Sequence, residues 1–437
     1  MTAPPGEYRS WGGLVARGSE IVGAADWIAH RAGHRSPVLA YGNGRSYGDS
    51  CLNDGGTLID TRGLDEVLAF DRETGLLTCE PGLLFDRLLD IVVPAGWFPP
   101  VTPGTSFVTI GGALANDVHG KNHHSAGTFG CHVRAFELMR SDGQSLLCAP
   151  DINADLFAAT IGGFGLTGLV TQVTLQLMPI RSAAMEQEIL HFDNLDGFFE
   201  LAASSDATHD YTVAWVDALA SGRHLGRGVL FRANHAPDYG FLPPSVGRNL
   251  RFPVRPPFPL INRTTLSAFN WLYRHSQPRG AAPRRVPYRP FFYPLDRIRD
   301  WNRVYGPQGL RQFQCAVPMA EARSAVEEML RRTLAAGEAS FLTVLKLFGA
   351  KRSPGLMSFP IQGATLTLDF ANRGARTEAL LTELDRIAIA AGGRVNPYKD
   401  ARMSPATFRA SFPQWRAFAA HIDSGFSSDF WRRVGSG

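Results

Sequence analysis

Short apolar runs and a helical repeat alternate along the first part of the chain. The runs PVLAY (37–41) and TLIDT (57–61) predict two strands, separated by the glycine-rich turn GNGRSYGD (42–49). In LLFDRLLDIVVPAG (83–96), apolar residues recur at helical spacing until the proline, which predicts a helix that ends there. The Asp-Gly pair within HVRAFELMRSDGQSLLCAP (132–150) predicts a β-hairpin. These patterns predict an α+β region whose glycines gather at turns.

The pattern changes near residue 180, after the helix-to-strand stretch DLFAATIGGFGLTGLVTQVTLQLMP (155–179). Beyond it, β-like runs such as YTVAWVDAL (211–219) alternate with amphipathic helices such as MAEARSAVEEMLRRTLAAG (319–337). Near the C-terminus a predicted helix ends at a glycine pair, and Lys399 follows in the loop YKDAR (398–402). We therefore expect a second region of different architecture.

Chain length supports this division. The 437 residues exceed the usual size of one hydrophobic core, and 44% hydrophobic with 19% charged residues is typical of a folded globular protein. We expect an N-terminal domain over 1–180, a second domain over 181–390 and a C-terminal segment over 391–437.

Charge, cysteine usage and hydropathy exclude several classes. A net charge of +4 is too small for a general nucleic-acid binder. The five cysteines form no C-x-x-C pair, which argues against a disulfide framework or a zinc ribbon. The start lacks the layout of a secretory signal, and no run of about 18 apolar residues occurs. We expect a protein of the cytoplasm or the inner-membrane surface, with a periplasmic location by another export route left open.

One segment, 239–295, is strongly basic. It contains nine arginines and no Asp or Glu, and prolines and large apolar residues lie between the arginines. This composition is typical of an irregular surface segment that meets anionic lipid head groups. A solvated, poorly ordered insertion explains it equally well.

Three glycine-rich loops occur in the N-terminal region, at 42–49, 103–112 and 162–168. Small residues in such loops let backbone N–H groups approach a pyrophosphate. Neither of the first two matches the dinucleotide fingerprint G-x-G-x-x-G at the start of a helix or a Walker loop. Each loop alone is best explained as a structural turn, but three in one region favour a large dinucleotide cofactor.

The stretch DVHGKNHH (117–124) raises the question of a metal site. His119, His123 and His124 could supply ligands if they shared one helix, but Gly120 and the upstream glycine pair argue against a helix there. No nearby Cys or carboxylate pattern completes a site. We expect no metal, and a structural role for His123, His124 and His132.

The motifs GNGRSYGD, PGTSFVTIGGALANDVHGKNHHSAGTFGCHVR, GGFGLTG, LGRGVLFR, TVLKLFG and YKDAR resemble those of the vanillyl-alcohol-oxidase class of FAD flavoproteins. The resemblance runs from about residue 10 to 435. It implies a two-part, PCMH-type FAD-binding domain, made of 1–180 and 391–437, around an α+β substrate domain built on an antiparallel sheet. Within the class, the motifs are similar to those of the branch that oxidises the 2-hydroxyl of polyprenyl-phosphoryl-β-D-ribose.

The resemblance implies positions that contact the cofactor. They are Ala40, Gly42, Asn43, Gly44, Arg45, Ser46, Tyr47, Gly48, Asp49, Gly104, Thr109, Ile110, Gly111, Gly112, Asn116, Asp117, Val118, His119 and Val170. Many members of the class tether the flavin through a histidine at the position of Arg45. Because arginine cannot form that bond, we expect non-covalent FAD.

The resemblance also implies the reaction. A secondary alcohol is oxidised to a ketone, with hydride passing to the flavin and a base removing the hydroxyl proton. It places Lys399, His119 and Tyr47 at the catalytic centre, with Lys399 as the base; without the resemblance, a surface lysine is the simpler interpretation. Implied substrate-binding positions are Lys121, Trp215, Gln312, Gln314, Lys346, Phe348, Thr365 and Thr367.

The resemblance implies partners as well: a polyprenyl-phosphate-linked pentose, and a separate NAD(P)H-dependent short-chain reductase that completes epimerisation to the arabinose form. The small net charge leaves no nucleic acid among the expected partners. Relatives carry Tyr, Asn, Cys and Tyr where this chain has Phe292, Thr365, Thr367 and Asn396. Those departures leave room for a different sugar or carrier. Two alternatives stay open: an oxidase of free sugar alcohols or aldonolactones, and a non-catalytic flavin-binding assembly subunit.

Overall fold

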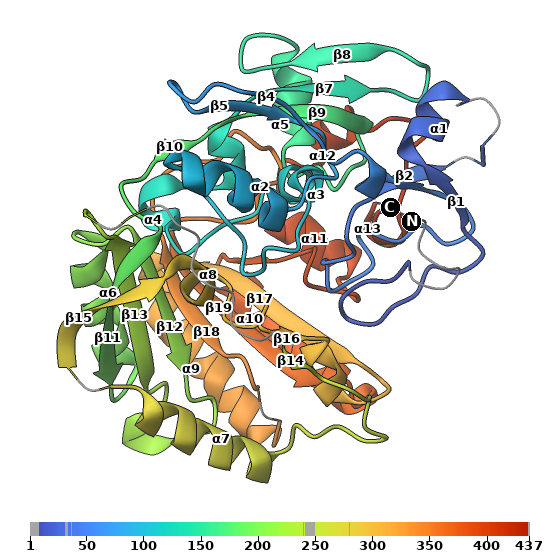
Figure 1. Cartoon of the computed structure of the whole chain (residues 1–437). Coiled ribbons are helices and arrows are strands. Elements are labelled where there is room, and N and C mark those ends of the chain that lie inside the picture. Colours follow the sequence, from blue (N-terminus) through green and yellow to red (C-terminus); the bar gives the residue numbers. More distant parts are fainter. Residues whose placement is uncertain are drawn as a thin grey trace.

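A computed structural model describes residues 8–30, 34–35, 37–238, 240, 250–278, 280–338 and 340–435 (Figure 1). The N-terminal region contains two main sheets. The first is parallel, in the order β1 (Glu20–Gly23), β3 (Thr57–Asp60), β2 (Val38–Tyr41). The second is antiparallel, in the order β4 (Val67–Phe70), β5 (Leu76–Cys79), β9 (Leu169–Gln176), β7 (Val133–Met139), β8 (Ser145–Cys148). A short pair joins β6 (Trp97–Phe98) to β10 (Met178–Pro179).

Short helices lie among these sheets. They are α1 (Ala24–Ala29), α2 (Phe85–Val92), α3 (Ile110–Ala115), α4 (His123–Ala126) and α5 (Ala154–Thr160). Single 3₁₀ turns occur at Thr61–Gly63, Val93–Ala95, Phe129–His132, Gly222–His224 and Trp301–Tyr305. The predicted strands at 37–41 and 57–61, the helix at 83–96 and the hairpin turn at Asp142-Gly143 all form.

The three histidines do not share one helix, as expected. His123 and His124 lie in the short helix α4, which begins after Gly120. Gly127, with φ of 76°, ends it after one turn. His119 lies outside α4 and pairs as an isolated bridge with Thr128. Among the described residues, no group of three or more His, Cys, Asp or Glu side chains is placed to hold a metal.

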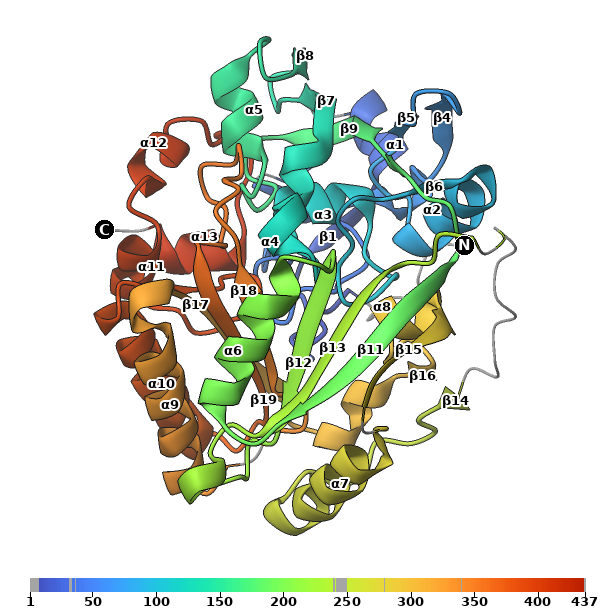
Figure 2. The same cartoon turned by 90° about the vertical axis from the view of Figure 1, so that its left-hand side faces the viewer.

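The second region is built on an eight-stranded sheet. Its order is β15 (Gly280–Pro287), β11 (Ala184–Phe192), β13 (Gly228–His235), β12 (Tyr211–Val216), β18 (Val344–Phe348), β19 (Gly363–Ala371), β17 (Leu310–Pro318), β20 (Arg394–Val395), and its pairs are antiparallel. Helices α6 (Leu195–Asp206), α9 (Met319–Ala335) and α10 (Ala375–Ala390) pack on one face (Figure 2). The other face is turned towards the N-terminal region.

The alternation within β19 explains this two-sided sheet. Leu366 and Leu368 point into the core that the helices cover. Thr365, Thr367 and Asp369 occupy the intervening positions, which lie on the opposite face because successive strand residues point to opposite sides. The sheet therefore presents a row of polar side chains to the N-terminal region.

The chain returns to the N-terminal region after β20. Helices α11 (Pro405–Ser411), α12 (Trp415–Ala419) and α13 (Asp429–Val434) follow. Phe418 and Phe430 pack against the ring of Phe164, and the backbone of Phe426 bridges to Val38. The boundary at 390/391 stays an expectation, since β20 still belongs to the large sheet.

The Arg-rich segment 239–295 is regular over much of its length, so the expectation of an irregular segment is wrong there. It contributes β14 (Leu250–Arg251), α7 (Arg263–Ser276), β15 and α8 (Tyr288–Phe292), and β14 pairs with β16 (Ile298–Arg299). Residues 239 and 241–249, with Arg248, and also Arg279, lie outside the described residues.

Local chemistry explains this order. Asn262 and Thr265 form a capping box at the start of α7, and no proline interrupts the helix. Pro283 and Pro287 are tolerated because β15 is an edge strand, which can lack backbone donors on one side. No helix of the described residues is both long and apolar enough to span a membrane.

Candidate active site

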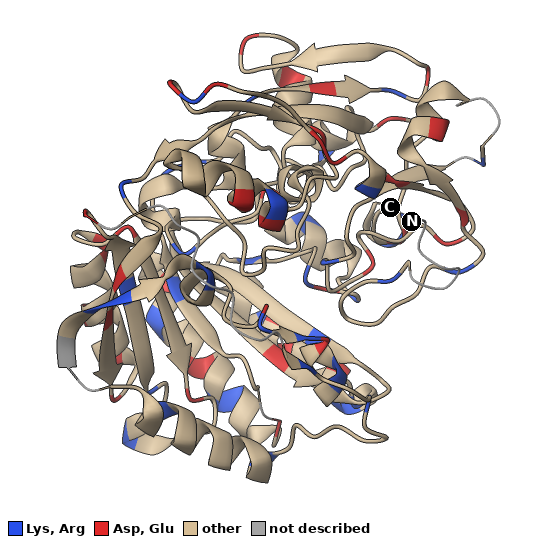
Figure 3. Ribbon diagram, in the orientation of Figure 1, with Lys and Arg blue, Asp and Glu red and all other residues tan. Residues whose placement is uncertain are grey.

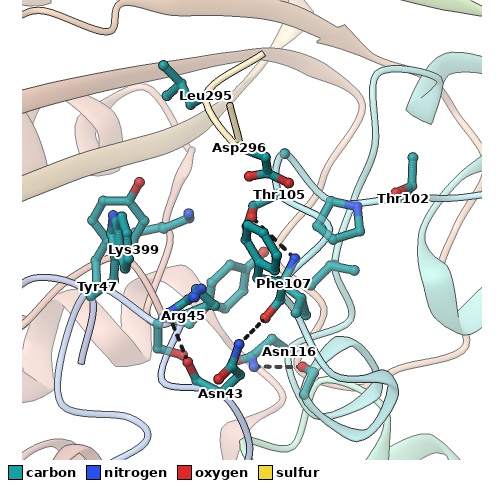
Figure 4. Close-up of a pocket in the computed structure, with 18 of the residues that line it drawn as sticks. Asn43, Arg45, Tyr47, Thr102, Thr105, Phe107, Asn116, Leu295, Asp296 and Lys399 are labelled. Carbon is teal, nitrogen blue, oxygen red and sulfur yellow. Dashed lines mark hydrogen bonds between the residues drawn. The ribbon is translucent and has the colours of Figure 1, made fainter. Parts of the chain in front are cut away.

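A cavity of about 1140 Å³ lies between the N-terminal region and the polar face of the eight-stranded sheet (Figure 4). On the N-terminal side, Gly165 and Gly168 of the third glycine-rich loop line it, and so do the first two glycine-rich loops. Asn43 joins them, because its Nδ2 donates to the Phe107 carbonyl at 2.7 Å. Thr109 Oγ1 accepts from the Gly112 amide at 3.1 Å and caps α3. Loops from two parts of the chain therefore form one continuous surface.

This wall fits an extended dinucleotide. A Cβ on Gly42 would lie 2.5 Å from Thr109 Oγ1, so only glycine keeps the two loops this close. Gly104 faces open space. The Ser50 hydroxyl also lines the cavity, is buried and has no hydrogen-bond partner among the described residues. A buried unpaired hydroxyl beside a glycine-lined wall is consistent with a polar ligand that supplies the missing partner.

Arg45 stands where many members of the class have the flavin-linking histidine. Its Nη1 donates to the Asn43 carbonyl at 3.1 Å, and its guanidinium lies 4.8 Å from the centroid of the Trp11 ring. Burial lowers the pKa of Arg45. The side chain is thus a fixed cation in the cofactor wall and offers no nucleophile for a covalent link.

Most of the expected cofactor positions line the cavity. Those that do are Ala40, Gly42, Asn43, Gly44, Arg45, Ser46, Tyr47, Gly104, Thr109, Gly111, Gly112, Asn116, Val118, His119 and Val170. Those outside the lining are Gly48, Asp49, Ile110 and Asp117. Their roles as contacts remain predictions, and the structure shows what else each of these four does.

Three of these four join parts of the scaffold. A Cβ on Gly48 would lie 1.8 Å from the Asp400 carbonyl, so glycine lets the 42–49 loop rest on the loop that carries Lys399. Asp49 forms an ion pair with Arg433 of α13 at 2.6 Å. Ile110 is fully buried in the core of the N-terminal region. These residues support the cavity wall from behind.

Asp117 connects the two regions. Its carboxylate is fully buried and accepts from the Gly130 amide at 2.8 Å and from the hydroxyls of Ser353 and Ser358, each at 2.5 Å. Burial nevertheless raises its pKa. Both serines belong to the segment between β18 and β19. The side chain therefore holds that segment against the turn that leads into His119.

His119 lies at the junction of the cofactor wall and the sheet. Gln314 Nε2 is 3.0 Å from its Nε2, and Lys346 Nζ is 3.3 Å from its Nδ1. Asn396 donates to Gln314 Oε1 at 2.8 Å, which turns the Gln314 amino group towards the imidazole. In this arrangement His119 accepts at Nε2 and carries its proton on Nδ1, so that Lys346 faces it as a free amine. Phe348 backs the imidazole, with ring centroids 4.8 Å apart.

The pKa values in this network agree with that assignment. Burial, followed by the nearby Lys346, lowers the pKa of His119 well below its usual range. Burial and the charge of Lys399 lower the pKa of Lys346 to about 7. Burial and Lys346 lower the pKa of Lys121, across the cavity, to about 7. Crowded cations removed from water thus favour the neutral amines.

Lysines are rare in this chain and concentrated at this site. The sequence has four, of which Lys121, Lys346 and Lys399 line the cavity while Lys351 is exposed. The other basic side chains are arginines, which do not lose a proton in proteins. The cavity therefore holds the amines that can act as acid or base.

Lys399 lies above the Tyr47 ring, with Nζ 4.2 Å from the ring centroid (Figure 4). Burial lowers the pKa of Lys399 to about 8, while the charge of Asp369 acts in the opposite direction. The pKa of Asp369 is itself raised to about 7 by burial. A lysine with such a pKa is a competent base near neutral pH.

The remaining expected substrate residues lie on the sheet. Trp215, Gln312, Gln314, Lys346 and Thr367 line the cavity, whereas Phe348 and Thr365 lie behind the lining. Thr365 accepts from Gln314 Nε2 at 3.1 Å and so helps to orient it. The direct contacts of these residues with substrate remain predictions.

Sequence reasoning missed two features. Asp369 is buried on the cavity face of β19, and the alternation TLTLD was the signal that could have identified it. The segment from α8 to β16 closes the cavity from the other side, because Asp296 accepts from the amide and hydroxyl of Ser106 at 2.7 and 2.8 Å. Tyr293 also bonds to Thr102. Nothing in a local pattern indicates contacts across some 190 residues.

Comparisons with known proteins agree with this geometry. A family model described as "FAD binding domain" matches residues 24–149. Decaprenylphosphoryl-beta-D-ribose oxidase of Mycolicibacterium smegmatis is 36% identical over 95% of this chain and 92% of its own length. An uncharacterized protein of Streptomyces coelicolor is 36% identical over 80% of this chain and 99% of its own. L-gulonolactone oxidase of Mus musculus is 33% identical over 32% of each chain. The chain therefore belongs to the decaprenylphosphoryl-β-D-ribose oxidase family of FAD-binding proteins and is an FAD-dependent oxidoreductase.

Proposed function

We propose that this enzyme oxidises the 2'-hydroxyl of a polyprenyl-phosphoryl-β-D-ribose to the 2-keto sugar. This is the first half of an epimerisation that yields a polyprenyl-phosphoryl arabinose, the donor for cell-envelope glycan synthesis, and a separate NAD(P)H-dependent reductase carries out the second half. The observation that carries the proposal is the confinement of Lys121, Lys346 and Lys399 to the cavity that the cofactor wall lines. The name of the Mycolicibacterium relative supports the substrate class.

Each residue around Lys399 has a separate role in the proposed oxidation. Bound FAD supplies an acceptor for the hydride that leaves the sugar carbon. Lys399 takes the hydroxyl proton as a free amine and becomes an ammonium, while the carbon–oxygen bond becomes a carbonyl. Tyr47 supports Lys399 from below through its ring face, which stabilises that ammonium. His119, neutral and fixed by Gln314, lines the same space without competing for the proton.

The other two lysines suit the anionic part of this substrate. Lys121 Nζ donates to the Phe291 carbonyl and lies 4.4 Å from the centroid of the Phe291 ring. Lys346 Nζ donates to the Gly120 carbonyl at 3.2 Å. A phosphate oxygen arriving near either amine favours its protonated form and gains a charge-assisted hydrogen bond. We assign the two amines to the phosphate or to the orientation of the sugar.

The far side of the cavity suits a lipid chain. Its apolar lining includes Phe231, Phe269, Tyr273, Val286, Phe291, Phe292, Leu295, Ile298, Phe341 and Leu342. Phe269 and Tyr273 belong to α7, whose outer surface exposes Trp271 and Leu272, each at 61%. Val254 and Phe258, just before α7, are 67% and 62% exposed. Exposed apolar side chains thus continue outward from the cavity lining.

Charge around this surface favours an anionic membrane. No acidic residue occurs in α7 or β15, and Figure 3 shows basic positions along both elements, of which Arg274 and Arg285 form ion pairs with Asp193, Glu186 and Asp238. Arg299 and Arg251, which forms an ion pair with Asp300, line the cavity beside them. Large apolar side chains bordered by arginines are typical of surfaces that insert among lipid head groups. We therefore propose peripheral membrane docking through α7 and residues 250–260, with the prenyl chain leaving the cavity there.

The catalytic proposal is tested by anaerobic mixing of the FAD-loaded protein with farnesyl-phosphoryl-β-D-ribose. We expect bleaching of the flavin band in the wild type and in Lys351→Ala, which removes an exposed lysine. Lys399→Ala should keep its FAD and lose reduction by roughly 10² to 10⁴-fold, the usual contribution of a general base. Bleaching by small polyols and not by the phospho-sugar would instead identify a free-sugar oxidase. FAD binding without bleaching by either would identify an assembly subunit.

Membrane docking is tested by vesicle sedimentation. We expect the wild type to bind vesicles with anionic lipid more strongly than neutral ones, and the double variant Trp271→Ser/Leu272→Ser to bind less. The matched control is Leu68→Ser/Leu147→Ser, which removes two exposed leucines from the five-stranded sheet. Equal binding by all three proteins to both kinds of vesicle would overturn this proposal.

A further inference from the structure

Asp369 is a fully buried carboxylate of the eight-stranded sheet. It lies on the cavity face of β19, directly opposite Gln312 of β17 in the antiparallel register. Gln312 Nε2 donates to Asp369 Oδ1 at 2.5 Å, and the Asp369 amide donates to Ser340 Oγ at 2.9 Å. Its side chain is fully buried, and Oδ2 has no hydrogen-bond partner among the described residues. One carboxylate oxygen is thus fixed and the other is unpaired.

The charged and titratable groups around Asp369 come from several elements. Lys399, in the loop after β20, lies over the Tyr47 ring and lines the same cavity as Gln312, the hydrogen-bond partner of Asp369, and its charge acts on the pKa of Asp369. Burial raises the phenolic pKa values of Tyr47 and Tyr305, and the charge of Asp369 raises them further. Both hydroxyls therefore stay neutral near pH 8. Among these groups, Lys399 is the one that can exchange a proton with Asp369 in the working range of pH.

Burial disfavours the ammonium form of Lys399. The charge of Lys399 adds to burial in lowering the pKa of Lys346 of β18 and of His119. A carboxylate on the cavity face offsets this, because an opposite charge in a poorly hydrated site stabilises the cation. Asp296 and Asp300 also line the cavity, but Asp369 is the carboxylate whose charge acts on Lys399.

We propose that Asp369 is a positioning residue for Lys399, and that its carboxylate, fixed by Gln312, stabilises the ammonium that Lys399 becomes when it takes the substrate's proton. The inference rests on the proposed role of Lys399 as the base. Asp369 itself touches neither the sugar nor the proton in this scheme. In other enzymes a buried carboxylate orients the base by a direct hydrogen bond. Here the Gln312 amide holds the carboxylate, and the carboxylate acts on Lys399 through its charge.

The variant that tests it is Asp369→Asn, which keeps the shape and removes the charge. Loss of the carboxylate should make Lys399 less basic, so the rise of the flavin-reduction rate with pH moves to lower pH by about one unit, as expected for a neighbouring charge at low dielectric. The limiting rate at high pH should fall several-fold, because the ammonium product is less stabilised. The matched control is Asp385→Asn, a buried carboxylate of α10 paired with Arg402 and outside the cavity lining. Its profile should coincide with that of the wild type.

A second measurement does not depend on turnover. Because the chain has four lysines, the reactivity of each amine with acetic anhydride can be followed by peptide mass spectrometry in the FAD-loaded protein, with exposed Lys351 as internal reference. Lys399 should become reactive about one pH unit lower in Asp369→Asn than in the wild type. If Asp369→Asn does not fold, Asp369→Thr, which copies Thr365 and Thr367 on the same face, removes the same charge.

The outcomes separate the two proposals. An unchanged Lys399 labelling profile in a folded charge-removal variant would overturn the role of Asp369, whatever the substrate. A shifted labelling profile in a protein whose flavin the phospho-ribose does not reduce would support the Asp369–Lys399 coupling and reject the proposed function. A loss of rate with no shift in either profile would mean that Asp369 is merely structural.

Discussion

Asp117→Ala offers a direct test of how the two regions are held together. The substitution removes the acceptor of three hydrogen bonds, from the Gly130 amide and from the hydroxyls of Ser353 and Ser358. Bonds to a charged group are worth about 1.5 to 3 kcal/mol each when deleted singly. They are not additive here, since all share one carboxylate whose burial is itself costly. We expect a net loss of about 3 to 5 kcal/mol in the free energy of unfolding.

The backbone adds a smaller contribution. Asp117 has φ of 42°, in the left-handed region, which costs alanine about 1 kcal/mol more than an Asp or Asn. The total of about 4 to 6 kcal/mol converts to a fall in Tm of about 4 to 6 °C, because a chain of 437 residues has an unfolding entropy of about 0.9 kcal/mol/K. Asp151→Ala, which removes an exposed carboxylate from the same domain, should leave Tm within about 1 °C.

The assay is differential scanning fluorimetry at FAD concentrations from stoichiometric to large excess. If Asp117 acted through a cofactor contact, as the sequence resemblance implied, excess FAD would restore the Tm by mass action. A structural loss is not recovered in this way, so the difference from the wild type should persist at every FAD concentration. Complete recovery at high FAD would refute the structural role argued for Asp117.

Three further predictions are independent of it. The anaerobic reduction rate should rise about tenfold between pH 7 and pH 9 as Lys399, with its pKa of about 8, loses its proton; a lysine of ordinary pKa would give about a hundredfold rise. Acid precipitation should release all FAD into the supernatant, because Arg45 cannot carry a covalent flavin; flavin fluorescence in the pellet would contradict this. Asn262→Ala should weaken α7 by about 0.5 to 2 kcal/mol, seen as faster amide exchange over 263–276 with unchanged exchange in α9.

Arginine and lysine occupy different places in this protein, and the difference bears on the chemistry of the site. Arginine supplies the ion pairs of the surface and of the interior, such as Arg232 with Glu188 and Arg402 with Asp385. Three of the four lysines instead line the cavity, where a side chain that can lose its proton and become a neutral amine can act as a base. An arginine at position 399 would stay charged at any working pH and could not act as the base.

Local sequence patterns predicted much of the N-terminal region. Strands at 37–41 and 57–61, the helix before Pro94 and the Asp142-Gly143 hairpin follow from short-range periodicity and turn chemistry, which depend on neighbours in the chain. The prediction of an irregular segment over 239–295 was wrong where α7 and β15 form. A capping box and an edge position in a sheet outweigh a composition rich in arginine and proline.

The sequence by itself determined the cofactor loops and the residue types of the site, because motif spacing fixes which side chains follow a glycine turn. Tertiary structure alone decided which of them meet. Lys399, Tyr47 and Asp369 are far apart in the chain, and their neighbourhood arises from the packing of a C-terminal loop on the 42–49 loop and against a sheet face. The same packing removes these groups from water, and that removal, which no local pattern encodes, lowers the pKa of Lys399 towards neutrality.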